Sequence, residues 1–122
     1  MSQDNPDINQ ILTTVKEFAE GVAKRSSGAE RYDALCAAFL MGVVQRELKL
    51  GERQDDGQLE QLQSMLGKQG DLAELYQAFS SSVREGHYDN DWQAAFDFAF
   101  KQVVDKVKVT NPNHLEVEHR DS

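Results

Sequence analysis

The sequence is poor in cysteine and proline and contains no long hydrophobic run. Its 122 residues include one cysteine, Cys36, and two prolines. A lone cysteine cannot form an internal disulfide or a thiolate metal cluster, which agrees with a reducing compartment, and we expect Cys36 to pack in the core. No apolar run approaches the ~20 residues of a membrane-spanning helix. The first residues are polar and acidic, so we infer no signal peptide and expect a cytoplasmic protein.

Basic residues are also scarce. The 13 Lys and Arg against 21 Asp and Glu give a formal net charge of -8. Binding to a nucleic-acid backbone requires clustered cations, so we expect no nucleic-acid partner. The nearest approach to a basic cluster is Lys101, Lys106 and Lys108, at the end of a predicted helix, where cations complement the helix dipole. An anionic cofactor at these lysines is the lesser alternative.

Hydrophobic residues recur almost everywhere at spacings of three and four, and two-residue alternation is nearly absent. This period predicts an all-α protein. The length fits one domain, and a hydrophobic content of 39% is sufficient for one core. We therefore predict a compact single-domain bundle of four long helices and one short helix over residues 1–115. Residues 116–122 are rich in charge without an apolar repeat, which predicts a mobile acidic tail.

Capping residues and glycines set the expected helix boundaries. Asn5 is the expected N-cap of the first helix, and the second is expected to run from Ser27 to a stop at Gly51. The later helices are expected over residues 59–66, 71–85 and 91–108, with a polar loop at residues 52–57. Gly67 and Gly86 are expected to end the first two of these helices, and Asp71 and Glu74 have the spacing of a capping box. We expect the second helix to be the most buried and Phe39 to lie in the core.

The residues that could carry catalysis are few. The histidines, His87, His114 and His119, all fall in predicted loops or the tail, and none is placed to serve Cys36 as a base. A single Glu116-x-x-His119 spacing lacks the second copy that a carboxylate-bridged metal site needs. No glycine-rich loop with the spacing of a nucleotide site is present. We therefore expect no enzyme activity, no metal site and no bound cofactor.

Three aromatic residues are candidates for binding a partner protein. Phe98 lies off the predicted main apolar stripe of the last helix, Trp92 lies near the start of that helix, and Tyr88 lies in the connection before it. Large rings on the surface of a small domain are typical of protein–protein contacts. Ordinary core packing is the alternative for each of them.

The order of several short segments is similar to that of a known family. These segments are Arg46-Glu47-Leu48-Lys49-Leu50-Gly51, Gly70-Asp71-Leu72-Ala73-Glu74-Leu75, Val83-Arg84-Glu85-Gly86 and a last helix that closes with Asn111-Pro112. Together they resemble a family of small, all-helical bacterial proteins classed as a domain of unknown function. Members of that family are encoded beside kinases of the aminoglycoside-phosphotransferase type and beside acyl-CoA dehydrogenases.

The resemblance implies a noncatalytic accessory subunit of such a kinase, which would phosphorylate hydroxyacyl-CoA thioesters in acyl-CoA catabolism. The kinase would supply the nucleotide and magnesium sites. The alternative is a homodimeric helical regulatory or scaffold protein without a kinase partner. Both roles agree with an acidic protein whose helices carry wide apolar stripes.

Overall fold

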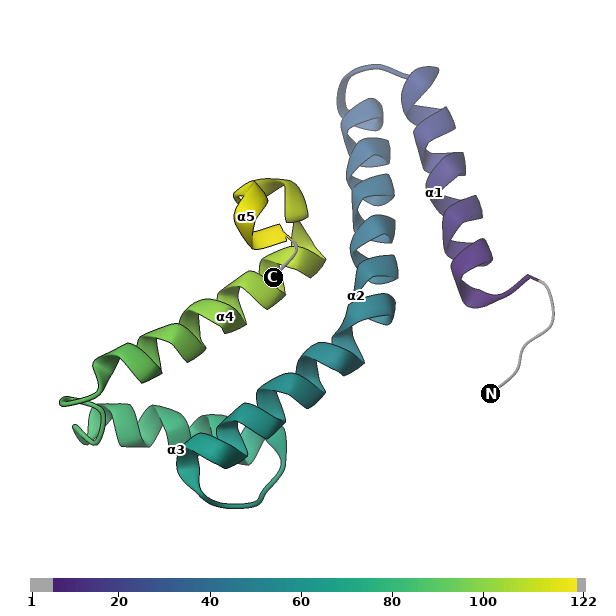
Figure 1. The fold of residues 1–122 in the computed structure, drawn as a ribbon. Helices are drawn as coiled ribbons and strands as arrows, with labels where there is room; N and C mark the ends of the chain where they lie inside the picture. The colour runs from purple at the N-terminus through teal and green to yellow at the C-terminus, as the bar shows by residue number, and fades with distance from the viewer. Residues whose placement is uncertain (1–5, 121–122) are drawn as a thin grey trace. The chain divides into compact units, whose positions relative to one another are not determined.

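The computed structural model describes residues 6–120, and this part of the chain is helical without strands (Figure 1). The helices are α1 (Ile8–Lys24), α2 (Gly28–Leu66), α3 (Leu72–Arg84), α4 (Trp92–Thr110) and the short α5 (Val117–Arg120), with a 3-10 turn, η1 (Pro112–His114), before α5. The prediction of an all-α protein with four long helices and one short helix is confirmed. The chain divides into two compact units, Met1–Lys49 and Leu50–Ser122, with the boundary inside α2.

The first unit is an antiparallel helical hairpin of α1 and the beginning of α2. Asp7 caps α1, because its carboxylate accepts a 2.8 Å hydrogen bond from the Gln10 backbone N–H and its own backbone N–H donates one to Gln10 Oε1. The Gln45 side-chain amide donates to Asn9 Oδ1 at 3.1 Å and to Thr13 Oγ1 at 2.9 Å, which joins the open ends of the two helices. Asn5, the predicted N-cap, lies outside the described residues.

The apolar stripe of α2 in the first unit is mostly exposed, contrary to prediction. Tyr32, Phe39 and Leu48 are 68%, 48% and 59% exposed, and Leu35, Leu40 and Val44 are exposed too. The buried residues of this unit are small instead, as described below. The predictions that Phe39 lies in the core and that this helix is the most buried are therefore wrong. The periodicity identified the apolar side of the helix but not whether anything covers it.

The second unit contains the large-residue core. Leu62 from α2, Leu75 and Phe79 from α3, and Phe98 from α4 form one buried cluster. The ring of Phe98 lies 5.1 Å, centroid to centroid, from that of Phe79 and meets it edge to face. Further apolar side chains pack around this cluster: Leu59, Met65, Leu66, Leu72, Tyr76, Tyr88 and Ala95.

The helix ends of the second unit follow the capping signals closely. Asp71 and Glu74 form the predicted capping box of α3, with a 2.8 Å hydrogen bond from Glu74 N–H to Asp71 Oδ1. Gly67 and Gly86 follow the ends of α2 and α3 at φ values of 65° and 84°, a conformation that favours glycine. At Gly86 a side chain would also meet Asp89 Oδ2 at 2.8 Å. The predicted helix stops at these two glycines are confirmed.

One boundary prediction is wrong. Helix α2 does not stop at Gly51, and the segment 52–57, predicted as a polar loop, is helical, so the predicted second helix and the short helix after it are one element. Near the C-terminus, residues Val117–Arg120 form α5 within the segment 116–122 that was predicted as a mobile acidic tail. Arg120 Nε donates to the Leu115 carbonyl at 3.0 Å, which holds this turn. The closure of α4 before Pro112 is as predicted.

Among the described residues, no helix combines the length and hydropathy needed to cross a membrane.

Neighbouring phenylalanines on α4 provide a test of the core. Phe98 is 1% exposed and Phe100 is 43% exposed. We expect Phe98→Ala to lower the free energy of unfolding by about 3–5 kcal/mol, because it leaves a cavity among three helices. Phe100→Ala, the matched control, is expected to cost about 1 kcal/mol or less. Urea denaturation of both variants measures the difference, and equal losses would contradict this placement of the core.

Candidate functional site: an exposed aromatic face

Helix α4 carries a row of aromatic side chains on its solvent side. Trp92, Phe96 and Phe100 follow one another at intervals of four residues, so they stand one above the other on the helix. Ring centroids are 6.5 Å apart for Trp92 and Phe96 and 5.9 Å apart for Phe96 and Phe100. The imidazole of His119, from α5, meets Phe100 edge to face at 5.2 Å and ends the row. We call these four residues the aromatic ladder.

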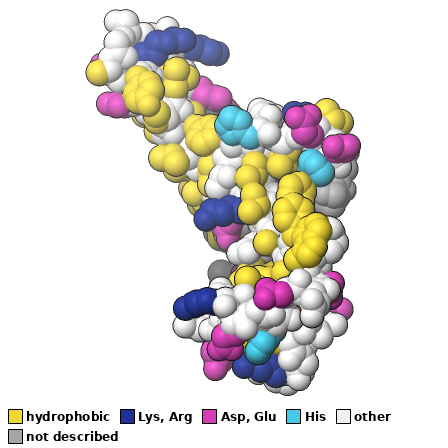
Figure 2. Space-filling model, turned by 90° about the vertical axis from the view of Figure 1, so that its left-hand side faces the viewer, with side chains coloured by type: hydrophobic (Ala, Val, Ile, Leu, Met, Phe, Trp, Pro, Cys, Tyr) yellow, Lys and Arg dark blue, Asp and Glu magenta, His cyan; other side chains and the backbone are white. Residues whose placement is uncertain are grey.

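The ladder is open to solvent. Trp92 is 63% exposed, Phe96 54% and Phe100 43%, and Val103 beside them is 58% exposed. Together these residues leave roughly 500 Å² of apolar surface in water, the size of the largest patches on ordinary monomers, which are often binding sites. Figure 2 shows hydrophobic side chains forming a continuous band on the second unit instead of being scattered singly. An apolar, aromatic surface of this kind is suited to binding another protein chain.

The three predicted partner-binding residues differ in how far they are exposed to solvent. Trp92 is on the surface and heads the ladder. Tyr88 is half-buried, with its ring 5.6 Å from the core residue Phe79. Phe98, predicted to lie off the buried stripe, is 1% exposed in the centre of the core, so its assignment to a partner surface is wrong. Helix α4 has apolar side chains on two faces, and the aromatic residues of its predicted main stripe, Trp92, Phe96 and Phe100, are exposed.

Sequence reasoning did not identify the ladder as a surface, and it missed a second feature on the opposite face of α4. Asp105, only 6% exposed, follows Phe98 by seven residues and so lies on the same side of the helix. Its carboxylate accepts hydrogen bonds from Lys101 Nζ at 2.9 Å and from Gln58 Nε2 at 3.2 Å, and its backbone carbonyl accepts one from Gln54 Nε2 at 2.8 Å. The sequence signal for this feature is the spacing of seven residues, about two helical turns, between Phe98 and Asp105.

The polar network continues into α3. The Tyr76 hydroxyl donates a short hydrogen bond to Gln58 Oε1, so Gln58 connects Tyr76 to Asp105. Burial, followed by the nearby carboxylates of Asp105 and Asp55, raises the pKa of Tyr76 to about 12. Each of these effects disfavours the phenolate. The network thus holds the parts of α2, α3 and α4 in the second unit in one arrangement.

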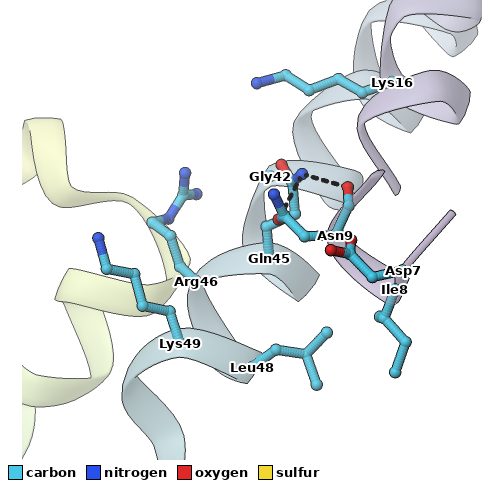
Figure 3. Close-up of a pocket in the computed structure, with 9 residues that line it drawn as sticks. All are labelled: Asp7, Ile8, Asn9, Lys16, Gly42, Gln45, Arg46, Leu48 and Lys49. Carbon is cyan, nitrogen blue, oxygen red and sulfur yellow. Dashed lines mark hydrogen bonds between the residues drawn. The ribbon is translucent and has the colours of Figure 1, made fainter. Parts of the chain in front are cut away.

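A pocket of about 810 Å³ opens in the first unit, at the free end of the hairpin (Figure 3). The Asn9–Gln45 hydrogen bond crosses it, and Ile8 and Leu48 contribute its apolar part. Three cationic side chains, Lys16, Arg46 and Lys49, and one carboxylate, that of Asp7, complete the lining. The lining therefore offers mainly positive charge and amide groups.

The described residues do not assemble a metal-binding group. His87 lies in the turn between α3 and α4, His114 in η1 and His119 against Phe100, and the half-buried Cys36 lies on α2. Within residues 6–120, no three His, Cys, Asp or Glu side chains converge as metal ligands would.

Comparison with known proteins gives the family. The profile of DUF6285, a domain of unknown function, matches residues 24–114, and the chain belongs to this family. The match covers α2 to η1 and leaves most of α1 outside. No curated protein and no solved structure matches the chain significantly. The resemblance to an all-helical family of unknown function is therefore confirmed. The genomic neighbours expected for that family stay a prediction.

The raised pKa of Tyr76 predicts a change in stability at alkaline pH. The ordinary tyrosine pKa of 10.0 applies to the unfolded chain, and the folded value is about 12. The protonated phenol therefore contributes stability that is fully present below about pH 10 and is lost as the pH rises to about 12. We expect Tyr76→Phe, which keeps the ring, to remove this part of the decline. Melting temperatures of both proteins between pH 8 and pH 12 measure it, and identical slopes would contradict the prediction.

Proposed function

We propose that this member of the DUF6285 family is a noncatalytic binding subunit that attaches to a larger protein through the aromatic ladder of α4. The observation that carries the proposal is the exposure of Trp92, Phe96 and Phe100 on one helix face. Stacked rings of this kind lose little conformational entropy on binding and bury large apolar areas, and tryptophan is the residue most enriched at binding hot spots.

The charge of the second unit indicates the chemistry of the partner. Residues 50–120 contain 13 acidic and 7 basic side chains. A negatively charged unit that carries an apolar ladder favours a partner whose contact surface is apolar in the centre and basic at the rim. Opposite charge at the rim would speed the encounter, while the rings would supply most of the affinity.

For the identity of the partner we propose a kinase of the aminoglycoside-phosphotransferase type that phosphorylates hydroxyacyl-CoA thioesters. The support is the resemblance of the segments around Leu48, Leu72 and Pro112 to a family encoded beside such kinases. In this arrangement the kinase holds the nucleotide and magnesium and carries out phosphoryl transfer. The small subunit stabilises the kinase or completes its acyl-CoA pocket, which needs no catalytic group of its own.

A second role, as a homodimeric scaffold without a kinase partner, is favoured by a different observation. The first unit exposes a separate set of large apolar residues that the ladder does not include, among them Phe18 and Leu40, 67% and 56% exposed. A self-associating hairpin would account for them. Self-association through the first unit would also be compatible with a kinase contact through the ladder, because the two contacts use different residues.

Reconstitution with a kinase of the aminoglycoside-phosphotransferase type from the same genome tests the proposal. We expect the two proteins to co-elute in size-exclusion chromatography and hydroxyacyl-CoA phosphorylation to require both. Phe96→Ser should weaken binding at least about tenfold, because it removes the middle ring of the ladder. Isothermal titration calorimetry measures the affinity.

The matched control is Phe39→Ser, which removes an exposed ring from the first unit, 48% exposed against 54% for Phe96. This variant should bind the kinase as the unchanged protein does. Weakening by Phe39→Ser alone would place the contact on the first unit and reject the ladder. Full kinase activity without this chain would reject the accessory role.

A further inference from the structure

The hairpin of the first unit lacks a large-residue core of its own. Within residues 6–49 every buried residue is alanine or glycine: Ala19, Ala23, Ala34, Ala38 and Gly42. The two helices therefore bury small side chains, while the large apolar side chains of both are exposed or only partly buried. Burial of large apolar side chains is the main favourable term in folding, so a helical pair in this state is incomplete.

Seven of the exposed residues form one surface, which we call the hairpin face: Ile8, Ile11, Val15, Phe18, Leu40, Val44 and Leu48. On α1 they follow the alternating spacing of three and four that places a and d residues of a coiled coil on one side of a helix. On α2 they recur every four residues. Ile8 and Leu48 line the same pocket (Figure 3), which brings the ends of the two rows to the same side of the hairpin.

The area of this face approaches what a stable dimer requires. Its residues are between 39% and 67% exposed. With fully open side chains of this size exposing about 150 Å² each, the low end of the range for aromatic rings, the face leaves roughly 550 Å² of apolar surface in water. A stable protein–protein interface buries about 800 Å² on each partner. Two such hairpins, face to face, would make the four-helix arrangement in which a and d positions are buried.

The distribution of charge favours a second copy of the same chain as the occupant. Residues 6–49 contain 6 acidic and 6 basic side chains, so the hairpin is electrically neutral. The whole excess of negative charge in the described part of the chain lies in residues 50–120. Two copies can therefore meet through the first unit without the like-charge repulsion that would oppose contact between two copies of the second.

We propose that the hairpin face is a homodimer interface in which two copies of the chain pack α1 and the first part of α2 into a four-helix bundle. This interface is independent of the proposed kinase contact. The ladder remains available to a different partner, so the assembly has two copies of the chain with one partner site on each.

Sedimentation equilibrium of the full chain, over concentrations from nanomolar to millimolar, tests the proposal. We expect the mass of a dimer that dissociates on dilution, with a melting temperature that rises with protein concentration. A monomer across this range, or a melting temperature independent of concentration, would by itself overturn the proposal.

A matched pair of substitutions locates the interface. Val15→Glu places a charge in the hairpin face, and Val103→Glu places the same charge beside the ladder; the two valines are 46% and 58% exposed. We expect Val15→Glu to be monomeric but to bind the kinase, and Val103→Glu to be dimeric but to bind the kinase poorly. A dimer in Val15→Glu together with a monomer in Val103→Glu would overturn the assignment. The kinase result tests only the proposed function, so the two proposals fail separately.

A second variant keeps the test valid if Val15→Glu loses helicity by circular dichroism. Leu40→Gln retains the side-chain length and uses a good helix former, at a position that is 56% exposed. We expect at least a tenfold weaker dimer with unchanged helicity. A dimer as strong as that of the unchanged chain would overturn the role of this face.

Discussion

The burial of Phe98 determines the arrangement of the second unit. Helix α4 has apolar side chains on two faces, so either face could in principle pack against α2 and α3. With the ring of Phe98 against Phe79 and Tyr76, Trp92 and Phe96 necessarily point to solvent. The same rotation brings Asp105 inward, since it follows Phe98 by two turns of the helix. The core, the exposed ladder and the buried carboxylate are thus consequences of one choice of helix face.

The buried carboxylate in turn explains why α2 is continuous. A buried charge is costly unless it has hydrogen-bond partners, and Gln58 donates to the carboxylate of Asp105 while Gln54 donates to its backbone carbonyl. Both side chains reach Asp105 from consecutive turns of α2. The polar segment 52–57 therefore has a reason to be helical that its own composition does not reveal. On one face of α4, Phe98 lies in the buried cluster with Leu62 of α2, and Asp105 accepts hydrogen bonds from Gln54 and Gln58 of α2. The two interactions therefore stabilise different parts of α2.

The sequence was sufficient for the local features and insufficient for the choice between faces. The helical period, the Asp71–Glu74 capping box and the glycines that end α2 and α3 were all predicted, because each depends on residues close in sequence. The burial of Phe98 and the exposure of Phe39 were predicted wrongly, because they depend on which helices pack together. Helix continuity through Gly51 was missed for the same reason, since its support comes from Asp105, far along the chain. The predicted partner-binding residues differ for the same reason: Trp92 is exposed, as a contact residue must be, whereas Phe98 is buried.

The position of the tryptophan makes the protein its own optical probe. Trp92 is the single tryptophan of the sequence, it heads the ladder, and 63% of it faces water. An indole in water emits at longer wavelength than one in an apolar contact. The intrinsic fluorescence of the unlabelled chain therefore reports the environment of α4 specifically. The first unit contains no tryptophan, so it contributes no second indole signal.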